Sequence, residues 1–116
     1  MAARILPQPN AAIREINVQE AANLLKQDAT VVVLDIRTPQ EFQQGHIAGA
    51  ENVDFRGPEF REKIEVLGRD KPFFVLCASG GCSTRSLSVF EELQFKQMYH
   101  LEAGINGWIA AGQPVK

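Results

Sequence analysis

Residues 73–86 read Phe-Phe-Val-Leu-Cys-Ala-Ser-Gly-Gly-Cys-Ser-Thr-Arg-Ser, and this stretch places a thiol between a strand and a helix. The apolar run 73–76 ends abruptly at Cys77 and predicts a short buried strand. Small residues follow, and helical periodicity begins at Ser83, so the residues between form a tight loop. We therefore expect Cys77 to be the last residue of the strand, facing the start of a helix.

This position predicts a reactive cysteine. Loop amides that point inward form a nest that binds anions, and a helix N-terminus adds a positive partial charge. A thiol held there has a lowered pKa and exists largely as the nucleophilic thiolate. The alternative is that Cys77 is simply a small buried residue, as most free cysteines are. The pair Gly80-Gly81 favours the reactive interpretation, because glycines are costly to order unless the backbone turns tightly or approaches a ligand.

Length and composition describe one globular domain. The chain has 116 residues, enough for one hydrophobic core and too few for two. Its 12 basic and 14 acidic residues give a net charge of −2, so nothing favours binding to nucleic acid. No apolar run is long enough to span a membrane, and residues 1–10 lack the apolar core of a secretory signal. We expect a cytoplasmic location, although a chain whose signal had been removed would look the same.

The two cysteines and two histidines predict neither a stabilising disulfide nor a metal site. Cys77 and Cys82 lie five residues apart, so a disulfide between them would close a tiny ring and stabilise little of the fold. Together with His46 and His100 they match no zinc-binding spacing. We therefore expect no metal and no cofactor. A cysteine pair at a helix start suits redox or sulfur chemistry better than architecture.

Strand and helix patterns alternate along the chain. Asn17 with Glu20, and Thr38 with Glu41, match capping boxes at two helix starts. The unbroken β-branched run 31–35 suits a strand buried on both faces. Strands are expected at residues 31–35, 50–53, 73–77 and 98–101, and helices at residues 18–26, from Pro39 onward, 58–67, 83–93 and 104–111.

This alternation predicts an α/β fold with a mostly parallel central sheet and helices on both faces. In such folds, ligands bind beyond the carboxyl ends of the strands. Cys77 and Asp35 both fall at strand ends, so they are expected on the same edge of the sheet. Residues 1–12 are expected to form a loose lead-in, and residues 13–116 to form the domain.

Three separated blocks give the chain a family resemblance. The first is residues 33–42 with Gly45-His-Ile-Ala-Gly-Ala50 and Asn52, and the second is the cysteine loop. The third is Leu101-Glu-Ala-Gly-Ile-Asn-Gly-Trp108 with Gly112-Gln-Pro-Val115. With these blocks in order, the chain resembles a single-domain rhodanese, a sulfurtransferase, from about Ile13 to Val115.

The resemblance implies a rhodanese-like α/β fold and a persulfide mechanism with Cys77 as the nucleophile. The Cys77 thiolate would take the outer sulfur of a donor such as thiosulfate, a persulfide or a polysulfide. A thiol, a protein cysteine or cyanide would then remove that sulfur, so the partners implied are small sulfur donors and thiol acceptors. The amides implied to hold the terminal sulfur belong to Ala78, Ser79, Gly80, Gly81, Cys82 and Ser83.

The cysteine loop departs from the family pattern in its charge. Many rhodaneses carry basic side chains directly after the cysteine and again five positions on, where this chain has Ala78 and Cys82. Arg85 either supplies part of the missing charge or is an ordinary solvated helix residue, and we favour the second interpretation. The related phosphatases place an arginine where this chain has Ser83, which argues against phosphatase or arsenate reductase activity.

Other polar residues have structural interpretations. Asp35 and Arg37, a hallmark pair of the family, are expected to lock the loop after the second strand through hydrogen bonds rather than to act in catalysis. Glu41 is expected to be a capping side chain, and His46 a structural residue of a turn. His100 ends a strand and has no evident partner in the sequence.

Two other functions stay open. A rhodanese-like fold can serve as a non-catalytic binding module, although the retained cysteine argues against this. Alternatively, the protein is a redox or polysulfide relay in which Cys82 attacks a Cys77 persulfide, expels sulfide and leaves a disulfide. That reaction requires the two Cα atoms to come within about 7 Å of each other.

Overall fold

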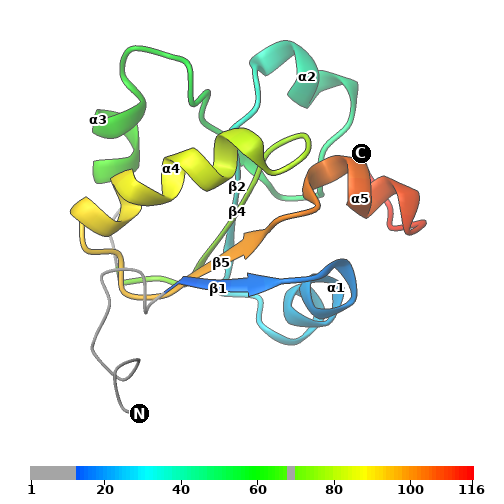
Figure 1. Ribbon diagram of the computed structural model, residues 1–116. Coiled ribbons are helices and arrows are strands. Elements are labelled where there is room, and N and C mark those ends of the chain that lie inside the picture. Colours follow the sequence, from blue (N-terminus) through cyan, green and yellow to red (C-terminus); the bar gives the residue numbers. More distant parts are fainter. Residues whose placement is uncertain (1–12, 68–69) are drawn as a thin grey trace.

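The computed structural model describes residues 13–67 and 70–116, and these build a five-stranded sheet in the order β1-β5-β4-β2-β3. Every neighbouring pair of strands is parallel, and β4 lies at the centre (Figure 1). The strands are β1 (Ile13–Ile16), β2 (Val32–Asp35), β3 (Glu51–Asn52), β4 (Phe73–Leu76) and β5 (Met98–Leu101).

The helices alternate with the strands, as a parallel sheet requires of its crossover connections. They are α1 (Val18–Gln27), α2 (Pro39–Gln44), α3 (Phe60–Glu65), α4 (Gly81–Glu92) and α5 (Gly104–Ala110). The longest has 12 residues, whereas crossing a bilayer takes about 20, and no helix in the described part of the chain is long and apolar enough to do so.

Helices cover both faces of the sheet. On one face, α3 and α4 pack Phe60, Ile64 and Phe90 against the sheet. On the other face, α1 and α5 contribute Ala21, Ala22, Ile105 and Trp108. All four residues of β4 are buried, because both faces of this central strand are covered. The predicted α/β fold with a parallel sheet and helices on both faces is therefore confirmed.

Both predicted capping boxes are present. The Asn17 side chain accepts from the Glu20 amide at 2.8 Å, and the Glu20 carboxylate accepts from the Asn17 amide at 2.9 Å. Thr38 and Glu41 make the same reciprocal pair at the start of α2, where Pro39 occupies the first turn. These helix starts follow from local sequence, since each cap reaches only three residues along the chain.

Several predicted boundaries were wrong. Residues 13–16 form an unexpected strand, because β1 pairs with β5 and a four-residue strand carries little signal of its own. The strand expected at 50–53 covers only Glu51–Asn52, and the helix expected at 58–67 covers Phe60–Glu65. The lead-in expected at residues 1–12 lies outside the described residues.

The largest correction concerns the cysteine loop. Strand β4 ends at Leu76, so Cys77 follows the strand instead of ending it. Helix α4 begins at Gly81, two residues before the expected Ser83, because Gly80 adopts a left-handed conformation and turns the chain directly into the helix. Cys82 therefore lies in the first turn of α4 rather than at the end of a loop.

Candidate active site

The turn after Cys77 depends on one glycine. Gly80 has φ +96°, and a Cβ there would collide with the backbone of Glu102. A side chain at Gly81 would meet nothing within 4 Å. The sequence argument from a glycine pair thus holds for Gly80, which has no room for a side chain, whereas Gly81 borders open space.

Backbone hydrogen bonds from helix α5 hold the same turn in place. The amide of Ile105 donates to the carbonyl oxygen of Cys77 at 2.8 Å, and the amide of Asn106 donates to that of Ala78 at 3.0 Å. Gly104, at φ +67°, allows this approach, because a Cβ there would collide with the same two carbonyl groups. The backbone of the reactive loop is therefore fixed by the helix that follows β5.

The Cys77 sulfur lies in a nest of donors. The amides of Gly80 and Ser83 each donate to Cys77 Sγ at 3.2 Å, and Ser83 Oγ lies 3.4 Å from it. Gly80 and Ser83 belong to the start of α4, where helix geometry leaves amides without an intrahelical acceptor. The sulfur takes the place that a capping side chain occupies at other helices.

These contacts set the charge of Cys77. Burial raises the pKa of the thiol, while the Ser83 hydroxyl and the amides of Ser83, Gly80 and Ser79 lower it, and the balance is a lowered pKa. Hydrogen bonds to the charged form favour that form. Cys77 is thus a buried group whose surroundings favour the thiolate, as the sequence predicted.

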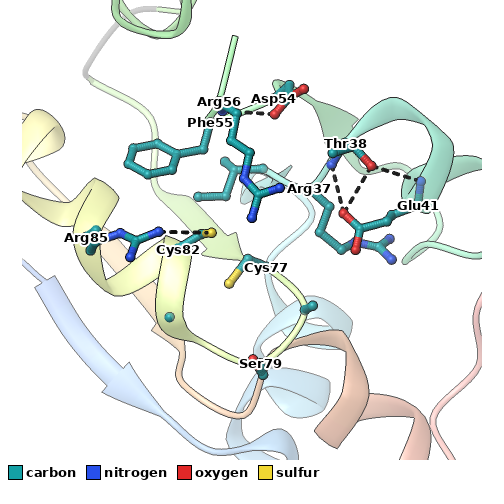
Figure 2. Close-up of a pocket in the computed structure, with 13 residues that line it drawn as sticks. Arg37, Thr38, Glu41, Asp54, Phe55, Arg56, Cys77, Ser79, Cys82 and Arg85 are labelled. Carbon is teal, nitrogen blue, oxygen red and sulfur yellow. Dashed lines mark hydrogen bonds between the residues drawn. The ribbon is translucent and has the colours of Figure 1, made fainter.

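A pocket of about 330 Å³ opens in front of Cys77 (Figure 2). Its floor is the reactive loop, where Ala78, Ser79, Gly81 and Cys82 line it beside Cys77. Its other walls come from the segments after β2 and β3. The pocket therefore lies at the carboxyl edge of the sheet, where the topology predicted a ligand site.

Basic side chains reach this pocket from outside the loop. Arg56, in the segment between β3 and α3, points into the pocket in Figure 2, and Arg85 lines it from α4. Within residues 13–67 and 70–116, neither guanidinium forms a salt bridge. Sequence reasoning missed Arg56, because nothing in the local pattern shows that its segment folds over the loop. Arg85 is exposed, as we favoured, yet it borders the pocket.

Acidic side chains also line the pocket, but Glu41 is held in place. The Thr38 amide that donates to the Glu41 carboxylate lowers the pKa of this group, and nearby Arg37 and Arg56 lower it further against the opposing effect of burial. Glu41 is therefore a carboxylate at neutral pH and serves as the expected cap. Asp54 accepts from the Arg56 amide at 2.9 Å, which orders the segment that carries Arg56.

Asp35 and Arg37 make the locking contacts expected of them. Arg37 donates through Nε to Asp35 Oδ1 at 2.8 Å and through Nη2 to the Gly45 carbonyl at 2.7 Å. Asn52 donates to the carbonyl groups of Asp35 and Arg37, at 2.9 Å each. Arg37 also lines the pocket, but its guanidinium is committed to this network.

Cys82 lies in the same pocket as Cys77, and both are free thiols. Arg85 Nη2 donates to Cys82 Sγ at 3.5 Å (Figure 2). The second thiol is thus placed beside a cation at the pocket wall. No group of three or more His, Cys, Asp or Glu side chains in the described ranges is arranged to hold a metal ion.

The two histidines have different surroundings. His46 stacks on Phe42 with ring centroids 3.8 Å apart, in keeping with a structural role. His100 is fully buried, and the structure gives it two partners that the sequence did not show. Its Nε2 lies 2.7 Å from Ser83 Oγ, and its Nδ1 lies 2.7 Å from a Glu15 carboxylate oxygen. Both partners come from elements distant in sequence, so local patterns carried no signal of them.

Comparisons with known proteins agree on one family. Residues 17–111 match the rhodanese-like domain model. The chain is 32% identical to Thiosulfate sulfurtransferase 16, chloroplastic, of Arabidopsis thaliana, over 72% of this chain and 78% of that protein. It is 31% identical to Thiosulfate sulfurtransferase GlpE of Pseudoalteromonas translucida, over 86% and 92%. A crystal structure of a rhodanese-related protein from Thermoplasma volcanium matches with a TM-score of 0.78 and 35% identity, covering 89% of this chain and 97% of that one.

Proposed function

Because the chain belongs to the rhodanese-like domain family, we propose that it is a sulfurtransferase that carries sulfane sulfur on Cys77. One observation carries this proposal: Cys77 Sγ accepts hydrogen bonds from two amides at the start of α4, inside a pocket, and the pKa of the Cys77 thiol is lowered. An activated thiolate is the nucleophile that a double-displacement reaction requires. The names of the relatives agree with a sulfurtransferase of the rhodanese type.

The proposed reaction has two balanced steps. The Cys77 thiolate attacks the outer sulfur of the donor, so that a new bond to Sγ forms as the donor's S–S bond breaks. With thiosulfate, the leaving group is sulfite, which departs with the electron pair. An acceptor thiolate or cyanide then attacks the outer sulfur of the persulfide and returns Cys77 as a thiolate. Neither step needs an external proton, oxidant or reductant.

Helix geometry supplies donors for the transferred sulfur. The first amides of α4 lack intrahelical acceptors, and those of Gly80 and Ser83 already donate to Sγ. The remaining two belong to Gly81 and Cys82, which border the pocket. We assign these amides to the outer sulfur of the persulfide, whose negative charge develops where they lie.

Arg56 and Arg85 are the groups we assign to an anionic donor. Both line the pocket, and together they offset the absence of basic side chains from the loop itself. Thiosulfate carries two negative charges, and guanidinium groups bind oxyanions through paired donors. The relatives named thiosulfate sulfurtransferase favour thiosulfate over a neutral polysulfane.

Intact-mass measurement tests the proposal. The purified protein is incubated with thiosulfate, and we expect a mass gain of one sulfur atom that cyanide removes as thiocyanate. Cys77→Ser should remain folded and gain no sulfur, because a hydroxyl is a far weaker nucleophile. Cys82→Ser is the matched control and should still gain sulfur. A folded wild-type protein that takes no sulfur from thiosulfate, polysulfide or a thiol persulfide would contradict the proposal and favour a non-catalytic binding module.

A second candidate function is the relay through Cys82. The observation in its favour is that Cys82 shares the pocket of Cys77 beside Arg85. In this reaction the Cys82 thiolate attacks Sγ of the protonated Cys77 persulfide, the bond between Sγ and the outer sulfur breaks, and the outer sulfur leaves as hydrosulfide with its proton and the electron pair as the disulfide forms. Released sulfide together with loss of both free thiols would support it. A persulfide of equal lifetime in wild type and Cys82→Ser would exclude it.

Phosphatase activity is not proposed. The residue six positions after Cys77 is Ser83, whose side chain is fully buried and directed to Cys77 and His100. It therefore offers no cation to clamp a phosphate in the pocket.

A cytoplasmic location stays a prediction from the sequence, which fractionation of the source cells would test.

A further inference from the structure

A continuous chain of polar contacts runs from the protein surface to the Cys77 sulfur. The Glu15 carboxylate lies 2.7 Å from His100 Nδ1, and His100 Nε2 lies 2.7 Å from Ser83 Oγ. Ser83 Oγ in turn lies 3.4 Å from Cys77 Sγ. These four residues come from β1, β5, α4 and the loop after β4, so the contacts cross one side of the sheet from its edge strand to its centre.

The residues in this series of contacts are buried except for Glu15 at its outer end. His100 and Ser83 are both 0% exposed, and Cys77 is 4% exposed. The Glu15 side chain is 54% exposed, because β1 is an edge strand. Since Glu15 and His100 stand opposite each other in the β1–β5 register, the carboxylate covers the buried imidazole from the solvent side.

The donors and acceptors in this series of contacts permit two arrangements of its protons. An ionised Glu15 accepts from His100 Nδ1–H, which leaves Nε2 of a neutral imidazole as an acceptor. The Ser83 hydroxyl then donates to Nε2, and its oxygen accepts the Cys77 thiol proton. In the other arrangement, the imidazolium donates to Ser83 Oγ from Nε2, and the Ser83 hydroxyl donates to the Cys77 thiolate. The Ser83 hydroxyl can also donate to the Gly80 carbonyl oxygen, at 3.3 Å, and this contact competes for the same single proton.

We propose that Ser83, His100 and Glu15 form a relay that receives the Cys77 thiol proton and stores it on the imidazole. In this step the Cys77 proton passes to Ser83 Oγ as the serine's own proton passes to His100 Nε2. The products are a thiolate and an imidazolium, so the net charge is unchanged. Glu15 acts through His100 and is a positioning residue, because its charge stabilises the imidazolium and orients the ring. This assignment rests on the proposed role of Cys77.

Other charged groups near the relay and the pocket could also affect the pH dependence of Cys77. On the side of β1, β5 and α4 that holds the relay, Glu15 and His100 are the titratable members of the relay, and Glu20 and Glu102 line the same surface hollow as Glu15. On the pocket side, the charged or titratable residues that line the pocket with Cys77 are Arg37, Glu41, Asp54, Arg56, Cys82 and Arg85. A variant at Glu15 leaves every one of these pocket groups unchanged.

The test measures how fast Cys77 is alkylated by iodoacetamide as a function of pH, with peptide mass analysis to separate Cys77 from Cys82. The variant is Glu15→Gln, which keeps the size of an exposed side chain and removes its charge. The matched control is Glu51→Gln, the same change on the opposite edge strand, β3. We expect the midpoint for Glu15→Gln to move to higher pH, with alkylation at pH 7 slower by about three- to tenfold, and the control to match wild type.

Two further changes separate a relay from mere structural support. His100→Gln retains a hydrogen-bonding group toward Ser83 but has no site for a proton, so the midpoint should again rise. In wild type, nitrogen NMR of the His100 ring should report an imidazolium at neutral pH and a neutral ring once Cys77 is alkylated. This second readout needs no variant and holds if His100→Gln does not fold.

The outcomes are distinct. Superimposable alkylation profiles for wild type and Glu15→Gln, or a His100 ring that does not respond to alkylation of Cys77, would overturn the relay. A shifted profile in a protein that takes no sulfur would preserve the relay and overturn the proposed sulfurtransferase function. Sulfur uptake with an unshifted profile would do the opposite.

Discussion

Helices α1 and α4 begin in opposite ways. At α1, Asn17 and Glu20 satisfy each other's amides through a capping box of exposed side chains. At α4, the N-cap is Gly80, which has no side chain, and the amides of Gly80 and Ser83 donate instead to the sulfur of Cys77. Both starts solve the same problem of unpaired amides, but with different partners.

The difference separates a stabilising helix start from a reactive one. The α1 cap is made within three residues of sequence and serves only the helix that it begins. At α4 the capping atom is the sulfur of Cys77, the residue that follows β4. The negative charge of its thiolate is the charge that the proposed reaction uses. Closeness to the pocket does not by itself make a helix start reactive. Thr38 and Glu41 line the pocket, yet they cap the first turn of α2 with a capping box of their own.

The largest expected effect comes from breaking the turn at Gly80. Gly80→Ala places a Cβ against the Glu102 backbone in a left-handed conformation, so we expect a loss of about 2–4 kcal/mol in the free energy of unfolding. Cys77 alkylation should also lose its elevated rate at neutral pH, because the nest opens. Urea denaturation and alkylation kinetics measure the two effects.

Gly81→Ala is the matched control for this change. A Cβ there meets open space, and alanine favours a helix interior by about 0.5–1 kcal/mol over glycine, so stability should be unchanged or raised. Equal destabilisation by both substitutions would contradict the distinction between the two glycines.

The next effect concerns pH. The lowered pKa of Cys77 means that the folded protein keeps its thiolate at a pH where the unfolded thiol is protonated. The thiolate therefore contributes stability that is fully present above the unfolded pKa and is lost as pH falls through the folded pKa. The alkylation rate of folded Cys77 should reach half its maximum at lower pH than that of the urea-unfolded chain. Coincident profiles would show that the nest does not favour the thiolate.

The smallest expected effect comes from the α1 cap. Asn17→Ala removes the acceptor of the Glu20 amide, so the free energy of unfolding should fall by about 1 kcal/mol, while Asn17→Gly should lower it by only a few tenths. Neither variant should change the alkylation profile of Cys77. A shifted profile would mean that the starts of α1 and α4 are coupled and do not act independently.

Local interactions explain why much of the molecule is predictable from its sequence. Both capping boxes depend on pairs three residues apart, and their residue types carry the signal directly. The buried strands β2 and β4 depend on unbroken apolar runs, which only a sheet covered on both faces accommodates. The thiol between a strand and a helix start is likewise a local pattern. These features needed no knowledge of which strands are neighbours.

Contacts between distant residues account for the rest. Strand β1 exists because it pairs with β5, and only that pairing brings Glu15 opposite His100, 85 residues away. Arg56 borders the pocket because the segment after β3 folds over the loop.

The sequence by itself therefore determined the α/β fold, the capped helices and the place of the thiol in the chain. The tertiary structure alone decided where α4 begins, which cations face the sulfur and which side chains connect it to the surface. The physical reason is that strand order and helix packing bring these groups together, and no local pattern of residues encodes them.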